Sequence, residues 1–226
     1  QRARMKWVRA AALSLCLCSI ATASGVALQG EATADERRVV VATTAGKLAG
    51  RASHGVVAFL GVPYGADTAT RRFQAALPAP AWQGTRSARQ FASVAPQDTE
   101  RGEAAGQSWS EDCLYLNVWT PRPGRDGQRP VLVYFHGGGY AHGTVTTPLY
   151  DGTRLARRGD VVVVTVNHRL NGFGHLYLAE IADARFRDSG NVGMLDLLLA
   201  LRWVRDNIAA FGGDRGRVTL FGQSGG

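Results

Sequence analysis

The chain is poor in cysteine, which excludes several kinds of small cross-linked domain. Only three of its 226 residues are cysteine, and two of them, Cys16 and Cys18, lie within the first 27 residues. Cys113 therefore stands alone in the rest of the chain. The sequence predicts no disulfide scaffold and no cysteine-based metal site, and we expect neither a metal nor a cofactor.

A strong excess of one charge is also missing once the first 27 residues are set aside. The whole chain carries a formal charge of +8, but residues 1–27 hold four basic side chains and no acidic one, which leaves +4 for the remainder. This modest balance gives no reason to expect nucleic acid as a partner. With 45% hydrophobic residues and no internal repeat, the chain can bury a core of ordinary globular type.

The first residues predict a secretory signal peptide. Basic side chains up to Arg9 precede a run of small and apolar residues at 10–23, which ends in the cleavage-like triplet Ala21-Thr22-Ala23. The run is too short to cross a bilayer comfortably, so no membrane span is expected. We expect residues 1–27 to be this peptide, Met5 to be the true start, and the mature protein to be secreted or periplasmic.

Hydrophobic periodicity predicts an α/β fold for the remainder. Apolar runs at residues 131–135 and 161–166 suit strands of a sheet covered on both faces, and a helical stripe runs over residues 194–211. Strand, helix, strand, helix, strand in this order implies parallel pairing with right-handed crossovers. Before them we expect a long irregular segment at residues 66–110, a short helix at 152–158, and strands at 39–41, 47–51, 56–62 and 114–119.

The last ten residues combine a strand with a reactive motif. Residues 218–221 form an apolar run that suits a buried strand, and residues 222–226 read GQSGG, which fits G-x-S-x-G. The flanking glycines allow a turn so sharp that Ser224 projects from the strand end. A serine hydroxyl held in this way becomes a nucleophile when a base removes its proton.

A second motif follows the strand at residues 131–135. Residues 136–140 read HGGGY, and consecutive glycines expose backbone N–H groups to a close ligand. Acyl transfer needs such donors, because the tetrahedral intermediate places negative charge on the former carbonyl oxygen. A phosphate cradle is disfavoured, since no Lys-Ser/Thr pair and no G-x-G-x-x-G follows the strand.

Taken together, the motifs resemble those of the type-B carboxylesterase family, which also contains the cholinesterases. The similarity runs from about Val39 to the end of the chain and includes GVPY at 61–64, RF at 72–73, EDCLYLNV at 111–118, VNHRL at 166–170 and GNVGMLD at 190–196. It implies an α/β-hydrolase fold, with a mostly parallel central sheet and helices on both faces, truncated after the turn that carries the nucleophile. Residues 28–226 would then be the N-terminal part of a single domain.

The resemblance also implies the chemistry. Ser224 would be the nucleophile of a serine carboxylic ester hydrolase that forms an acyl-enzyme with a small-molecule ester. Gly138, Gly139 and Gly225 would supply the oxyanion-binding N–H groups. The family's order places the acid and the histidine of the triad beyond Gly226, so residues 1–226 alone are expected to be inactive.

Several residues depart from the family pattern or receive structural roles from it. Ala95 stands where the family often has the partner of Cys113, so Cys113 is expected to be a free buried thiol. Gln223 and Gly225 replace a commoner Glu and Ala without removing a backbone donor. Asp112, Asp196 and Arg169 are expected to be structural, with Asp196 meeting a buried polar partner; Arg169 is expected to form an ion pair.

Three alternatives remain open at this stage. An upstream histidine could replace the missing base, the candidates being His54, His136, His142, His168 and His175. The same site could serve an amidase, a lactonase or a carbamate hydrolase. The chain could also be a catalytically inactive, cholinesterase-like binding module, because a fold does not determine a function.

The signal peptide gives the first testable prediction. When the gene is expressed with its native start in a bacterial host, we expect an exported protein whose first residue lies shortly after residue 23 or 27. Amino-terminal sequencing of the purified protein measures this. An unprocessed cytoplasmic product that begins at Met5 would contradict the prediction.

Overall fold

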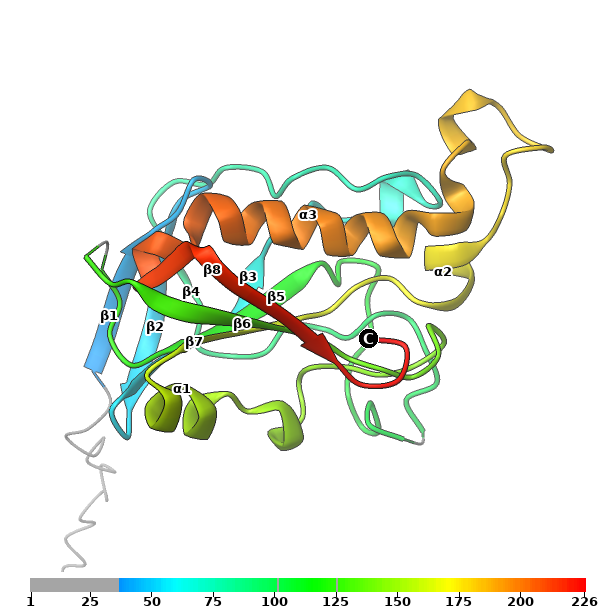
Figure 1. Ribbon diagram of the computed structural model, residues 1–226. Coiled ribbons are helices and arrows are strands. Elements are labelled where there is room, and N and C mark those ends of the chain that lie inside the picture. Colours follow the sequence, from blue (N-terminus) through cyan, green and yellow to red (C-terminus); the bar gives the residue numbers. More distant parts are fainter. Residues whose placement is uncertain (1–36, 101, 125) are drawn as a thin grey trace, which may run out of the picture. The chain divides into compact units, whose positions relative to one another are not determined.

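The computed structural model describes residues 37–226 except 101 and 125, so the predicted signal peptide lies outside the described residues. Within the described part of the chain, no helix is long and apolar enough to cross a membrane. The described residues belong to one unit organised around a single sheet, shown in Figure 1.

The first strands form an antiparallel meander. β1 (Arg37–Ala42) pairs with β2 (Lys47–Ser53), which pairs in turn with β3 (Val56–Pro63). Turns of only a few residues join them, and such short connections permit antiparallel pairing alone. The predicted hairpin and the strand that follows it are therefore confirmed.

The rest of the sheet places the last strand beside a much earlier one. β5 (Tyr115–Thr120), β6 (Arg129–Phe135), β7 (Val162–Val166) and β8 (Gly213–Gly222) complete the order β1-β2-β3-β5-β7-β6-β8, and the short β4 (Thr85–Ser87) pairs with β2. β6 is parallel to both β7 and β8, while β3, β5 and β7 are antiparallel neighbours. The sheet is thus mixed, and the predicted parallel pairing belongs to the three strands that carry the motifs.

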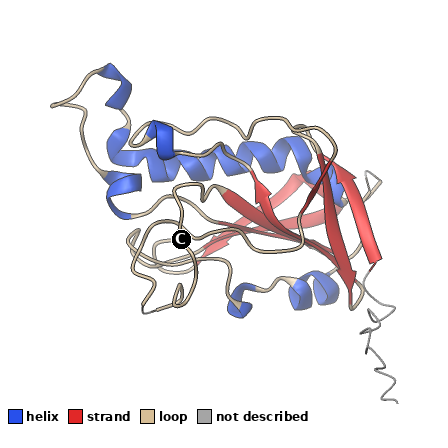
Figure 2. Ribbon diagram, turned by 180° about the vertical axis from the view of Figure 1, so that it is seen from behind, coloured by secondary structure: helices blue, strands red, loops and turns tan. Residues whose placement is uncertain are grey.

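Helices cover both faces of this sheet, as predicted (Figures 1 and 2). α3 (Val192–Asn207) buries Leu199, Trp203 and Val204 against the larger core, and α1 (Thr153–Gly159) buries Ala156 beside Trp119 on the opposite face. The remaining elements are short: η1 (Ala69–Arg71), η2 (Pro148–Tyr150), α2 (Asn171–His175), η3 (Ala184–Phe186), η4 (Ser189–Asn191) and η5 (Ile208–Phe211). The segment at 66–110 is irregular as expected, apart from the short η1 and β4.

β8 differs from its prediction in length and in burial. It begins at Gly213, five residues before the predicted start, and Leu220 and Phe221 are 51% and 40% exposed. The prediction that residues 218–221 form a buried strand is wrong for these two side chains. The reason is that, among the described strands, β8 has a neighbour on one side only, which is β6.

A buried ion pair joins the end of β7 to α3. Arg169 donates from Nε and Nη2 to the two carboxylate oxygens of Asp196, at 2.8 and 2.7 Å, and its backbone N–H donates to the same carboxylate at 3.1 Å. Both side chains are almost completely buried. Burial raises the pKa of Asp196, and the bonds from Arg169 oppose that shift. The predicted structural role of both residues is confirmed.

This ion pair gives a stability prediction. Asp196→Ala leaves a buried guanidinium without its counter-ion, so we expect the free energy of unfolding to fall by roughly 3–5 kcal/mol. Adding Arg169→Met removes the stranded charge and should restore part of that loss. Urea unfolding curves of the two variants measure the difference. Equal stability of the single and double variants would show that the charge pair is not what fixes α3.

Candidate active site

The glycine-rich loop leaves the sheet directly from the end of β6. Gly138 and Gly139 have φ of 105° and 58°, and Tyr140 has φ of 61°. A Cβ built at Gly138 would collide with the carbonyl oxygen of His142, so the tight path of the loop requires glycine there. Gly138 accepts the N–H groups of Ala141 and His142 at 3.1 and 3.2 Å, which closes the loop into one turn.

A sharp turn follows β8 and carries Ser224. The serine has φ of 56°, a left-handed conformation that is uncommon for a residue with a side chain and is concentrated at functional sites. The Gly226 N–H donates to the carbonyl of Gln223 at 3.0 Å and closes the turn. A Cβ at Gly222 would collide with Gly226, and one at Gly226 would collide with the Phe135 carbonyl, so the motif glycines are needed for space.

The loop and the turn meet because β6 and β8 are parallel neighbours. Phe135 and Gly222, the last residues of the two strands, are paired in register. A Cβ position at Gly137 lies 3.1 Å from the Cβ of Ser224, and one at Gly225 lies 3.5 Å from the backbone nitrogen of Gly139. The structure therefore brings the predicted residues together at the carboxyl ends of two adjacent strands.

The N–H groups of Gly138, Gly139 and Gly225 donate to no acceptor within the described residues. Three backbone donors near an exposed serine hydroxyl form an arrangement that can bind a developing oxyanion. The same arrangement offers no cluster of metal ligands, since the described residues contain no group of three or more His, Cys, Asp or Glu side chains suited to one.

Comparisons with known proteins identify the family of this chain. The model of the carboxylesterase family matches residues 37–226. The chain belongs to the carboxylesterase family. It is 41% identical over 192 residues to the para-nitrobenzyl esterase of Bacillus subtilis (strain 168); the aligned region covers 83% of this chain and 38% of that protein. It is 43% identical over 206 residues to the acetylcholinesterase of Gallus gallus, and this aligned region covers 84% of this chain and 26% of that protein.

Solved structures confirm the α/β-hydrolase fold of this carboxylesterase family member. A carboxylesterase from Geobacillus stearothermophilus superposes with a TM-score of 0.76 at 44% identity, over 82% of this chain and 37% of that one. A para-nitrobenzyl esterase superposes with a TM-score of 0.74 at 41% identity, over 82% and 38%. The chain thus spans less than two fifths of the length of these relatives.

None of the described upstream histidines of this carboxylesterase chain bonds Ser224, and three of them have hydrogen bonds elsewhere. His136 and His168 are buried and stack with ring centroids 4.7 Å apart, and their Nδ1 atoms bond the carbonyls of Gly137 and Arg169 at 2.8 and 3.0 Å. His175 packs against Tyr140, and His54 bonds Ser53 on the β2–β3 turn. His142 belongs to the glycine-rich loop itself. Within the described residues, no hydrogen bond joins a histidine to Ser224.

Asp112 and Asp196 have hydrogen-bond partners away from Ser224, and Cys113 lies in the core. Asp112 accepts the Tyr115 hydroxyl at 2.8 Å, and Asp196 holds Arg169. Cys113 is a free, buried thiol, as predicted, and lies in the same core cluster as Ala95. Burial raises the pKa of Cys113 well above its ordinary value, so the thiol stays protonated.

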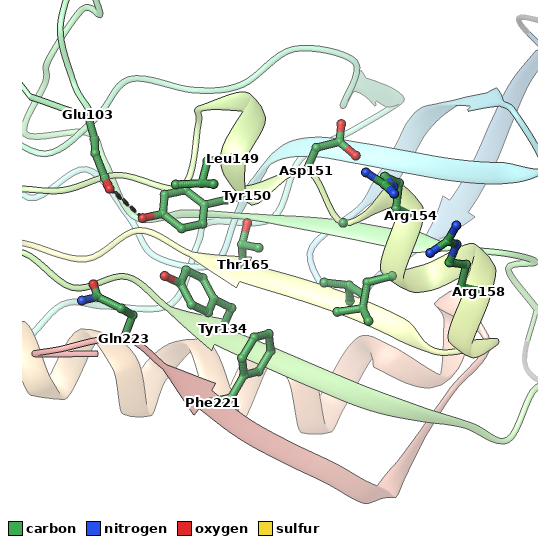
Figure 3. A pocket seen from close by; sticks show the side chains of 13 residues that line it. Glu103, Tyr134, Leu149, Tyr150, Asp151, Arg154, Arg158, Thr165, Phe221 and Gln223 are labelled. Carbon is green, nitrogen blue, oxygen red and sulfur yellow. Dashed lines mark hydrogen bonds between the residues drawn. The ribbon is translucent and has the colours of Figure 1, made fainter.

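A pocket of about 790 Å³ lies on the α1 face of the sheet, beside the turn rather than at the serine. Figure 3 shows the aromatic rings of Tyr134, Tyr150 and Phe221 along it, with Gln223 at one end. Tyr150 donates to the Glu103 carboxylate at 2.8 Å, and burial raises the pKa of Tyr150 above its ordinary value. Neither Ser224 nor Gly138, Gly139 or Gly225 lines this pocket.

Two polar residues that the sequence analysis did not single out contact the glycine-rich loop, Gln97 through its side chain and Asn171 through its backbone. Gln97 bonds both backbone groups of Gly143, and Asn171 bonds the carbonyl of Tyr140 through its backbone N–H. Neither residue lies in a recognisable motif for such a role, because their partners are tens of residues away in the sequence. Only the folded chain reveals these contacts.

The stacked histidines give a prediction about pH. Burial lowers the pKa of His136 and of His168 to about 4, whereas an unfolded histidine titrates near 6.5. The unfolded chain therefore binds more protons between these values, and the free energy of unfolding should fall as pH drops from about 6.5 to about 4. We expect roughly 2–3 kcal/mol for each histidine.

The matched variants are His168→Gln and His54→Gln. His168→Gln should show a smaller loss of stability between pH 6.5 and 4 than the wild type, whereas His54→Gln should keep the full loss. Urea unfolding at a series of pH values measures the slopes. A slope that His168→Gln leaves unchanged would show that other groups control the acid sensitivity.

Proposed function

We propose that the protein is a serine carboxylic ester hydrolase in which Ser224 is the nucleophile. The observation that carries the proposal is the left-handed Ser224 at the end of β8, beside the backbone nitrogen of Gly139 and the adjacent Gly225. Membership of the carboxylesterase family supports ester hydrolysis as the reaction.

The proposed reaction uses these groups in turn. Ser224 Oγ attacks the ester carbonyl while a base takes its proton, and the carbonyl oxygen becomes an oxyanion held by the N–H groups of Gly138, Gly139 and Gly225. Collapse of this intermediate breaks the bond to the alcohol, which leaves with a proton from the base. Water then attacks the acyl-enzyme by the same steps and releases the carboxylic acid.

The base and its orienting acid are proposed to lie beyond Gly226. His136, His168 and Asp196 are engaged in other contacts, and the chain spans only 38% of the para-nitrobenzyl esterase that it matches. Without a base the Ser224 hydroxyl stays protonated, so residues 1–226 alone are proposed to be inactive. Residues 1–27 are proposed to direct export of the mature protein.

Hydrolysis of amides, lactones or carbamates would use the same nucleophile and the same oxyanion donors. These alternatives differ in leaving group, so they are separated by comparing turnover of matched esters, amides and carbamates. An inactive binding module is the remaining alternative, and the geometry at Ser224 disfavours it. The left-handed backbone conformation of this serine costs free energy, and a binding surface does not require that conformation.

The experiment uses protein expressed from the complete gene, its Ser224→Ala variant, and residues 37–226 alone. The complete protein should hydrolyse p-nitrophenyl acetate and react with a fluorophosphonate at Ser224, and Ser224→Ala should lose both properties, with turnover falling by about 10⁴-fold or more. Residues 37–226 should show neither. Mass spectrometry of the labelled peptide identifies the modified residue.

Two results would contradict the proposal. A complete protein that neither labels nor turns over would support the binding module. A shorter protein that labels at Ser224 would show that one of the upstream histidines is the base.

A further inference from the structure

The glycine-rich loop holds one residue with a side chain, Tyr140, in a backbone conformation that its residue type does not favour. Tyr140 has φ of 61°, in the left-handed region, and Gly143 has φ of 115°. Residues with side chains occupy this region only when the surrounding structure imposes it. Among the described residues, the loop's internal backbone–backbone hydrogen bonds run from Ala141 and His142 to Gly138, and none of them reaches Gly143. Contacts from elsewhere must therefore hold its far end.

Gln97 supplies such a contact at Gly143. Its Oε1 accepts the Gly143 N–H at 2.8 Å, and its Nε2 donates to the Gly143 carbonyl at 2.8 Å. Nε2 also donates to the carbonyl of Ala95 at 3.1 Å, which fixes the orientation of the amide. A side-chain amide carries both a donor and an acceptor, so it pairs with both backbone groups of one residue.

Asn171 supplies a second contact, at Tyr140. Its backbone N–H donates to the Tyr140 carbonyl at 2.6 Å, and its Nδ2 donates to the carbonyl of Pro96, also at 2.6 Å. Pro96 is the neighbour of Gln97 in the chain. The two contacts therefore close a ring in which residues 95–97 hold the loop at Gly143 directly and at Tyr140 through Asn171.

Gly143 is packed closely against the start of the loop. A Cβ at Gly143 would collide with Nδ1 of His136 and with the carbonyl of Gly137, so the two ends of the loop are in contact. A displacement of Gly143 is thereby transmitted to residues 137–139. Those residues carry two of the three N–H groups assigned above to the oxyanion.

We propose that Gln97 is a positioning residue for the oxyanion-binding loop, and that Asn171 acts with it. The inference rests on the proposed function of Gly138 and Gly139. Among the described residues, Gln97 has no hydrogen bond to Ser224; it fixes Gly143, and through Gly143 it keeps the N–H groups directed at the place where the oxyanion forms. Donors that are preorganised in this way stabilise the transition state more than the ground state.

The deciding variant is Gln97→Glu, which preserves the shape of the side chain and removes its N–H donors. A carboxylate would face the carbonyl oxygens of Gly143 and Ala95, so the contact becomes repulsive. The matched control is Gln107→Glu. Gln107 is also partly buried in the same irregular segment. Its Nε2 donates to the Glu103 carbonyl at 3.1 Å and its Oε1 accepts the Thr146 hydroxyl; both partners lie outside residues 136–143, and a carboxylate keeps the second contact.

The measurements are made on protein expressed from the complete gene, with p-nitrophenyl acetate and active-site titration. We expect Gln97→Glu to lower kcat per titrated site by about 10- to 100-fold while KM changes little, because a small displacement of catalytic donors acts on the transition state. Affinity for a trifluoromethyl ketone, whose adduct with serine carries an oxyanion, should weaken by the same factor as kcat/KM. Gln107→Glu should change neither.

Hydrogen exchange separates failure of this inference from failure of the proposed function. If the wild type hydrolyses esters and Gln97→Glu keeps its kcat and its affinity for the ketone, the inference is overturned. If the wild type hydrolyses nothing, the proposed function fails, and exchange of the amides at 138–143 decides the role of Gln97. Faster exchange in Gln97→Glu than in Gln107→Glu supports the inference that Gln97 holds the loop at Gly143, and equal exchange overturns it.

Discussion

The parallel pairing of β6 with β8 is the constraint on which the site depends. The register places Phe135 opposite Gly222, so the chain leaves both strands at the same edge of the sheet and at neighbouring positions. The glycine-rich loop and the turn that carries Ser224 are therefore packed together in one small volume. That volume admits no Cβ at Gly222 or Gly226, which explains why glycines surround Ser224. The backbone donors and the proposed nucleophile meet because two strands far apart in the sequence are neighbours.

The irregular parts of the chain have a defined task in this arrangement. The segment at 66–110 lacks the periodicity of a helix or a strand, yet it supplies the Gln97 amide and the Pro96 carbonyl that hold the loop. The stretch after β7 supplies Arg169, buried against Asp196 of α3, and two residues later Asn171. A buried ion pair adds little net stability compared with apolar packing. Its value here lies in fixing the direction in which the chain leaves β7.

The sequence predicted the parts of this structure that depend on local signals. The hairpin, the strands that carry the motifs, α1 and α3 follow from apolar periodicity and from short turns, and the positions of Gly139, Ser224 and Gly225 follow from motifs at strand ends. The prediction that Leu220 and Phe221 are buried was wrong, because burial depends on neighbouring strands and β8 has a described neighbour on one side only. The roles of Gln97 and Asn171 were not predictable, since one side-chain amide carries no signal of its partner.

The stacked histidines form an uncharged pair beside the strained glycine-rich loop. His136 begins the glycine-rich loop and His168 follows β7, and each ring uses one nitrogen to hold a backbone carbonyl. Burial keeps both rings uncharged at neutral pH, since it lowers the pKa of each to about 4. Two charged rings 4.7 Å apart would repel each other and displace the start of the loop. The neutral pair instead packs as an aromatic stack, so the same contact that supports the loop at pH 7 becomes a source of strain when the pH falls.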